Sequence, residues 1–89
     1  MDKEELKGNW IYQHTLDGEV VYIGKGSGYN GQRSRDLGRS NKEHVELLRK
    51  GALDISIIIH GLEHHESYSY ERILIDELQP KFNTMYKAR

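Results

Sequence analysis

The sequence contains no cysteine, which excludes disulfide bonds and thiolate-bound metal sites. It has one proline, and no apolar run approaches the roughly 18 residues that a membrane-spanning helix requires. The first residues, Met-Asp-Lys-Glu-Glu, are polar and acidic, unlike the apolar centre of a signal peptide. These absences predict a cytoplasmic protein that does not enter a membrane.

A length of 89 residues, with 36% hydrophobic and 30% charged residues, is typical of one globular domain. We therefore expect a single domain over residues 1–89, with residues 1–8 as a frayed or helical lead-in. The net charge of −1 argues against strong non-specific binding of nucleic acid. However, residues 25–50 hold seven basic and three acidic side chains, so a polyanion would be attracted to this part of the chain.

Two segments, residues 10–14 and 20–23, are rich in the β-branched and aromatic residues that favour strands. Asp17-Gly18 lies between them and is a hairpin-turn dipeptide, because glycine tolerates the positive φ of a tight turn. We therefore predict a β-hairpin over about residues 9–24. The glycines that follow it predict an open, flexible loop, at positions 24, 26, 28 and 31.

Two helices are predicted after this loop. Residues 32–37 have the composition of a short helix. Ser40, with Glu43 three residues later, fits a capping box, so a second helix would run to Lys50 and stop at Gly51. Its core-facing side would carry two apolar residues, Val45 and Leu48.

A third strand and a final helix complete the predicted order. Residues 53–59 begin as an alternating pattern and end apolar, which predicts a half to fully buried strand. Residues 63–78 have helical periodicity and end before Pro80. The order β-β-α-α-β-α indicates an α+β domain in which helices flank a three-stranded, mostly antiparallel sheet.

Two tripeptides on the hairpin form a pair: Trp10-Ile11-Tyr12 and Tyr22-Ile23-Gly24, with nine residues between the tyrosines. This pair resembles the signature of the GIY-YIG nuclease family. Three further residues follow in the order of that family: Arg33 beyond the glycine loop, Glu71 in the last helix, and Asn83 in Pro-Lys-Phe-Asn. The resemblance spans about residues 9–83.

The chain departs from the family at two positions. Trp10 stands where the family usually has glycine. Family members with a similar loop often place a histidine four residues after the arginine, and here that residue is Leu37. The role of that histidine is therefore vacant or falls to another residue, such as His44.

The resemblance implies the GIY-YIG fold and an endonuclease that hydrolyses phosphodiester bonds with one divalent ion, Mg²⁺ or Mn²⁺. It implies Tyr12 as the base, with Tyr22 in support. A tyrosine hydroxyl has a usual pKa of about 10, so it is a poor base unless positive charge lowers that pKa. Lys25 and Arg33 are the candidates to supply the charge. The alternative is that both tyrosines are amphipathic strand residues, half-buried in the sheet.

Basic residues in and after the glycine loop are the candidates to bind substrate. Arg33 suits a phosphate because its guanidinium is planar and always charged, and Arg35 could take its place. Lys25 and Gly26 lie where backbone could approach a phosphate closely. His44 could assist from the second helix, or lie on the surface. Three other cations of this region are expected to be solvated helix charges: Arg39, Arg49 and Lys50.

Glu71 heads the stripe that Leu74, Ile75 and Leu78 form at helical spacing. A carboxylate on a core-facing stripe is costly unless a cation or hydrogen bonds compensate it. Either Mg²⁺ or Arg33 would do so, and the family position favours the metal.

Asn83 could orient Glu71 or the waters of the metal, or could form the turn after Pro80. His60 and His64 have ligand-like spacing for zinc, but a strand-to-helix boundary separates them, which favours a solvated helix start.

The expected partner is nucleic acid, with DNA favoured over RNA, and the domain would act as a monomer or homodimer. A standalone nuclease of a phage or mobile element fits this size. The alternative is a catalytically inactive module of the same fold, which binds nucleic acid or a protein.

Overall fold

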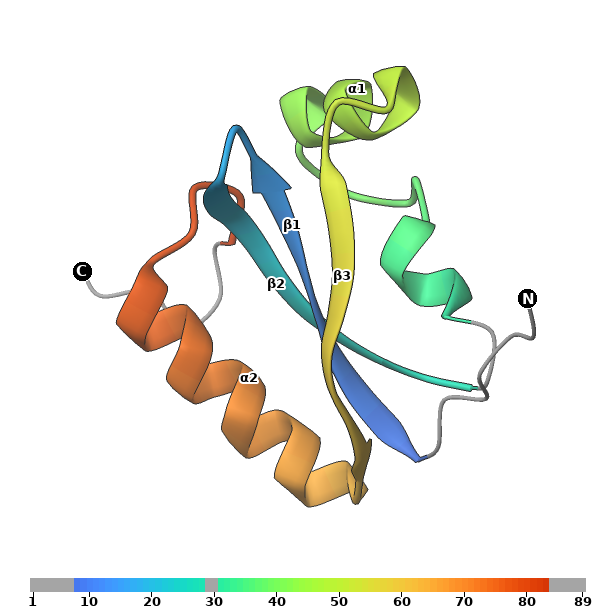
Figure 1. Cartoon of the computed structure of the whole chain (residues 1–89), viewed down its shortest axis with the longest axis vertical. Coiled ribbons are helices and arrows are strands. Elements are labelled where there is room, and N and C mark those ends of the chain that lie inside the picture. The colour runs from blue at the N-terminus through green and yellow to red at the C-terminus, as the bar shows by residue number, and fades with distance from the viewer. Residues whose placement is uncertain (1–7, 29–30, 84–89) are drawn as a thin grey trace.

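The computed structural model describes residues 8–28 and 31–83, and the lead-in predicted over residues 1–8 lies almost entirely outside them. The predicted order of elements is confirmed (Figure 1). It comprises strand β1 (Asn9–Leu16), strand β2 (Glu19–Ser27), the 3₁₀ helix η1 (Gln32–Arg35), helix α1 (Lys42–Lys50), strand β3 (Asp54–Leu62) and helix α2 (His64–Leu78).

The three strands form an antiparallel sheet in the order β2-β1-β3, so β1 is the central strand. The predicted hairpin turn is confirmed: Asp17 and Gly18 both have positive φ, 52° and 84°, as a two-residue turn of this kind requires. However, β2 continues through Ser27. The prediction of an open loop from Gly24 onwards is therefore wrong for residues 24–27, which belong to the strand. Those residues pair with the first half of β1, down to Asn9.

Aromatic rings on β1 explain why glycines stand in β2. Trp10 lies opposite Gly26, and Tyr12 lies opposite Gly24. A Cβ atom added at Gly24 would come within 2.4 Å of the Tyr12 phenol, and one at Gly26 within 2.5 Å of the Trp10 ring. The Trp10 indole is fully buried and donates a hydrogen bond of 2.9 Å to the Gly28 carbonyl. A strand glycine thus provides the space that each ring occupies.

Alternation along the strands separates two faces of the sheet. Ile11 and Ile23 point to the face that α2 covers and form a buried cluster with Ile75. Tyr12 and His14 point to the opposite face, where His14 meets Ser34 of η1. Figure 1 shows α2 on one side of the strands and η1 on the other.

The edge strand β3 is less buried than predicted. Ile55 and Ile58 are 37% and 39% exposed. The reason is that α2 packs mainly on β1 and β2, which leaves β3 with little cover among the described residues.

Helix α1 begins one residue later than predicted, because Asn41 rather than Ser40 is its N-cap and accepts a hydrogen bond of 3.0 Å from the His44 amide. Its end at Gly51 is confirmed. The buried residue of α1 is His44, whereas Val45 and Leu48 are only partly buried. The short helix before it is a 3₁₀ turn that ends at Arg35.

Helix α2 starts with a capping box in which Glu63 and Glu66 bind one another's backbone amides. No helix within the described ranges is both long and apolar enough to cross a membrane.

Replacing Gly24 with alanine should lower the free energy of unfolding by about 1–3 kcal/mol, because the new methyl group displaces the buried Tyr12 ring. Urea unfolding measures the change. The matched control is Gly38→Ala, where the methyl group meets only the carboxylate end of Asp36, at 3.2 Å. Equal stability of the two variants would contradict the close packing of Tyr12 on β2.

Candidate active site

A pocket of about 320 Å³ brings together five of the predicted site residues, which come from both sides of the sheet: Tyr22, Arg33, His44, Glu71 and Asn83. Arg39, which was expected to be a solvated charge, also lines it. The other predicted residues do not line the pocket: Tyr12, Lys25, Gly26 and Arg35. Gly26 is instead a strand residue under the Trp10 ring.

The two signature tyrosines lie together, with their ring centroids 6.0 Å apart. Tyr12 is fully buried, and its hydroxyl accepts a hydrogen bond of 2.7 Å from Arg39 Nη1. Burial, with a smaller contribution from Tyr22, raises the pKa of Tyr12 to about 12, although Arg39 and Arg33 act in the opposite direction. Arg33 therefore acts on this pKa in the expected direction, but desolvation outweighs both arginines and the net pKa is raised, which makes Tyr12 a poorer base than expected.

Lys25 lies on the α2 face of the sheet and does not reach the tyrosine pair. Its Nζ atom is 4.2 Å from the centroid of the Tyr68 ring. Its charge acts on Glu71 instead, where it lowers the pKa of the carboxyl group against the larger effect of burial.

Glu71 is partly buried on α2, one turn before Ile75, as the periodicity predicted. Burial raises the pKa of its carboxyl group. Among the described residues it makes no hydrogen bond or ion pair, and the proposed partner Arg33 binds Asp36 at 3.1 Å instead. The stripe ends sooner than predicted, since Leu78 is 47% exposed.

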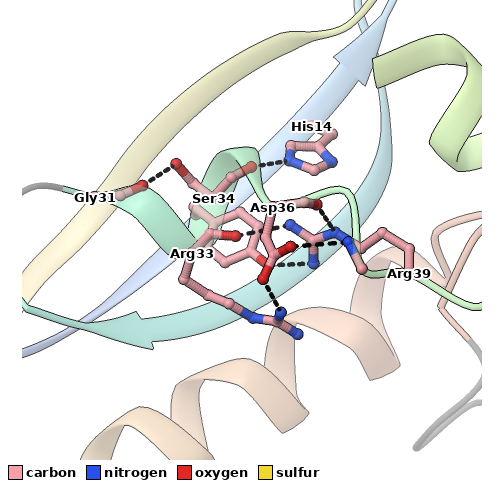
Figure 2. A network of polar contacts seen from close by, with 8 residues as sticks. His14, Gly31, Arg33, Ser34, Asp36 and Arg39 are labelled. Atoms are coloured by element: carbon pink, nitrogen blue, oxygen red, sulfur yellow. Dashed lines mark hydrogen bonds and ion pairs between the residues drawn. The ribbon is translucent and has the colours of Figure 1, made fainter. Parts of the chain in front are cut away.

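The arginines after the glycine loop differ in their surroundings. Arg33 is exposed and ion-paired with Asp36. Arg35 donates a hydrogen bond of 3.3 Å to the Gly31 carbonyl and does not line the pocket. Arg39 is partly buried and donates to two backbone carbonyls as well as to Tyr12 (Figure 2). Contacts with backbone in a loop have no sequence pattern, so the prediction missed this residue.

Two buried histidines lie beside the tyrosines. His14 Nε2 is 2.7 Å from the Ser34 carbonyl, and His14 Nδ1 is 2.9 Å from His44 Nε2. A carbonyl only accepts, so the proton of His14 is on Nε2, and His14 Nδ1 accepts the proton of His44 Nε2. His44 Nδ1 is then a hydrogen-bond acceptor. The sequence analysis did not single out His14, although strand alternation places it on the face of Tyr12.

Both histidines are held neutral. Burial lowers the pKa of His14, and burial, His14 and Arg39 together lower the pKa of His44 to about 4. The His44 ring stacks on Phe82, with centroids 4.7 Å apart. His44 was left open as a surface or a helper residue, and it is buried at the pocket wall.

Asn83 is buried, and both ends of its amide bind the backbone of Ile23 on the edge of β2. Its Oδ1 atom accepts from Ile23 N at 2.8 Å, and its Nδ2 atom donates to Ile23 O at 2.9 Å. The amide of Phe82 donates to the Val21 carbonyl at 2.9 Å. These contacts attach the turn after Pro80 to β2 and account for the burial of Asn83.

The described part of the chain contains no group of three or more histidine, aspartate or glutamate side chains that could hold a metal. His60 and His64 lie in this part, so they do not belong to such a group. Glu71 is the carboxylate of the pocket. A single unpaired carboxylate suits a hard cation such as Mg²⁺, which retains most of its water ligands.

The buried histidines make stability depend on pH. Their pKa values are lower in the folded chain than in the unfolded one, so the stability present above about pH 6.5 is lost as the pH falls towards 4. For His44 the loss should be about 2 kcal/mol, and His44→Phe should flatten this part of the curve. Urea unfolding between pH 7 and pH 4.5 measures it. His65→Gln, at an exposed position, should leave the curve unchanged, and an unaltered curve in His44→Phe would contradict the assignment.

Comparison with known proteins identifies the fold. No family model and no curated protein matches the chain. The crystal structure of the GIY-YIG N-terminal endonuclease domain of UvrC from Thermotoga maritima, bound to magnesium, matches with 24% identity and a TM-score of 0.66. The match covers 90% of this chain and 88% of that one. A point mutant of the same domain matches with 22% identity and a TM-score of 0.60, over 90% of this chain and 87% of that one. The chain therefore has the fold of a GIY-YIG domain.

Proposed function

We propose that this domain is an endonuclease that hydrolyses phosphodiester bonds with one Mg²⁺ or Mn²⁺ ion bound by Glu71. One observation carries the proposal: a partly buried carboxylate, without a partner among residues 8–28 and 31–83, lines a pocket that also contains Tyr22 and two arginines. A carboxylate that is partly removed from water gains from a cation. The similarity to an endonuclease domain bound to magnesium supports the same choice of ligand.

Glu71 is the residue that would hold the ion, and the ion would stabilise negative charge on the phosphate and the leaving oxygen. Lys25 assists by its charge, because it keeps the pKa of Glu71 lower than burial alone would set it. The carboxylate form, which binds metal, is therefore maintained to lower pH.

We assign the role of base to Tyr22 in preference to Tyr12. A base must reach the proton that it accepts through a hydrogen bond or a single water. Tyr22 lines the pocket, whereas Tyr12 is fully buried and its hydroxyl is bound to Arg39. Tyr12 then acts as a positioning residue that holds Arg39 and the ring of Tyr22.

His44 contributes an acceptor to the pocket wall. Its Nδ1 atom has no partner among the described residues, and none of their fully buried side-chain nitrogen or oxygen atoms lacks one. Nδ1 therefore keeps a small contact with solvent, although His44 as a whole is only 1% exposed. A neutral imidazole at this place is suited to orient the attacking water.

DNA is the proposed substrate. The residues of the pocket would act on its phosphodiester group. One active site would cut one strand at a time. A monomer that nicks, or a homodimer that cuts both strands, fits this arrangement. The cytoplasm and a phage or mobile element remain the predicted setting.

Glu71→Gln should lower the rate of plasmid cleavage at least about 100-fold in Mg²⁺ or Mn²⁺, because the amide is a much weaker metal ligand than the carboxylate. Supercoiled and branched DNA are the substrates, and circular dichroism verifies the fold. Glu77→Gln, at an exposed position of the same helix, should cleave normally. Full activity of a folded Glu71→Gln protein would refute the metal site. Binding without cleavage by the unmodified protein in both metals, on DNA and RNA alike, would identify an inactive binding module.

Tyr22→Phe should lower kcat about 100-fold, while Tyr12→Phe should lower it less than about 10-fold, because only Tyr22 reaches the pocket. Steady-state kinetics at saturating DNA measure kcat for both variants. The opposite order would return the role of base to Tyr12.

A further inference from the structure

The loop between η1 and α1 holds a guanidinium in a fixed position at the pocket. Arg39 donates through each of its three nitrogens: Nε to the Asp36 carbonyl at 2.7 Å, Nη2 to the Arg33 carbonyl at 2.8 Å, and Nη1 to the Tyr12 hydroxyl at 2.7 Å. Figure 2 shows the contacts of the guanidinium with Asp36 and Arg33. All three partners belong to the folded framework, so the group is positioned before any ligand arrives.

Donors remain on Arg39 after these contacts. A guanidinium has five N–H groups, and three are used, which leaves one on Nη1 and one on Nη2. Two donors on neighbouring nitrogens are the number that a bidentate contact with a phosphate requires.

The charge of Arg39 is compensated only from a distance: the Asp36 carboxylate interacts with it electrostatically but forms its ion pair with Arg33. Within the described residues it forms no ion pair with a carboxylate, since its acceptors are two carbonyls and a phenol. Arg33, the other arginine of the pocket, differs in both respects: it is exposed, and the Asp36 carboxylate neutralises it at 3.1 Å. A phosphate would therefore be attracted more strongly to Arg39 than to Arg33.

The position of Arg39 relative to the tyrosines matches this role. Its Cζ atom is 5.6 Å from the centroid of the Tyr12 ring and 5.2 Å from that of Tyr22. A phosphate bound to Arg39 would therefore lie close to Tyr22, the proposed base. The arginine that the resemblance selects, Arg33, acts on Tyr12 only through its charge, whereas Arg39 also donates a hydrogen bond to the Tyr12 hydroxyl.

We infer that Arg39 is the principal phosphate-binding residue of this pocket, and that Arg33 has a secondary role because Asp36 occupies it. The inference rests on the proposed phosphodiester substrate. It adds a specific function for a residue that lies outside the signature of the sequence.

The test measures binding rather than cleavage, so that it is independent of the chemical step. A fluorescein-labelled DNA duplex is titrated with Glu71→Gln protein by fluorescence anisotropy in Mg²⁺ at 50 to 200 mM KCl. Adding Arg39→Gln should weaken binding about 10-fold and reduce the slope of log K against log salt by about one, since one phosphate contact is lost. Adding Arg33→Gln should weaken binding less than about threefold, and Arg49→Gln, on the exposed side of α1, should have no effect.

A variant that retains the charge separates binding from folding. Arg39→Lys should keep the salt slope but bind about threefold to tenfold more weakly, because an ammonium group cannot form the bidentate contact. Thermal melting verifies that each variant folds. Unchanged affinity in Arg39→Lys and Arg39→Gln, a larger loss in Arg33→Gln, or no binding by the parent protein would overturn the inference. A parent protein that binds through Arg39, while the unmodified domain never cleaves, would refute only the proposed nuclease activity.

Discussion

The packing of the Tyr12 ring on Gly24 is the contact on which the pocket depends. Because the strand opposite Tyr12 has no side chain there, the ring lies over β2, with its hydroxyl within 2.7 Å of Arg39. That hydroxyl is one of three acceptors that fix the guanidinium, so the loop between η1 and α1 is positioned through it. A larger residue at position 24 would displace the ring and, with it, the loop that forms one wall of the pocket.

The charges around the pocket are arranged so that one carboxylate stays available. Each nearby cation has a partner other than Glu71: Asp36 binds Arg33, the Tyr68 ring lies under Lys25, and backbone carbonyls bind Arg39. Burial also keeps the neighbouring histidines neutral, so they add no competing positive charge. As far as the described ranges extend, Glu71 thus remains available as a ligand, at a cost in desolvation that appears as its raised pKa.

Local patterns in the sequence were sufficient to predict the order of elements, the hairpin turn and the side of α2 that carries Glu71, because each depends on neighbours along the chain. The length of β2 was not predictable in this way, since its glycines are explained by rings on another strand. That error also misplaced Lys25: three residues after Tyr22 in a continuous strand, it must face the opposite side of the sheet. Arg39 was missed because its acceptors are backbone carbonyls, which any residue provides.

The two departures from the family pattern have different physical consequences. Trp10 replaces a small residue, and the structure accommodates it because Gly26 lies opposite and the Gly28 carbonyl accepts its indole proton. Leu37 is 45% exposed and leaves no gap in the core, so its position requires no compensation for packing. The polar group beside the two tyrosines is instead Arg39, which lies two residues further along the chain. An arginine cannot exchange protons near neutral pH, so Arg39 is suited to charge stabilisation rather than to proton transfer at this side of the pocket.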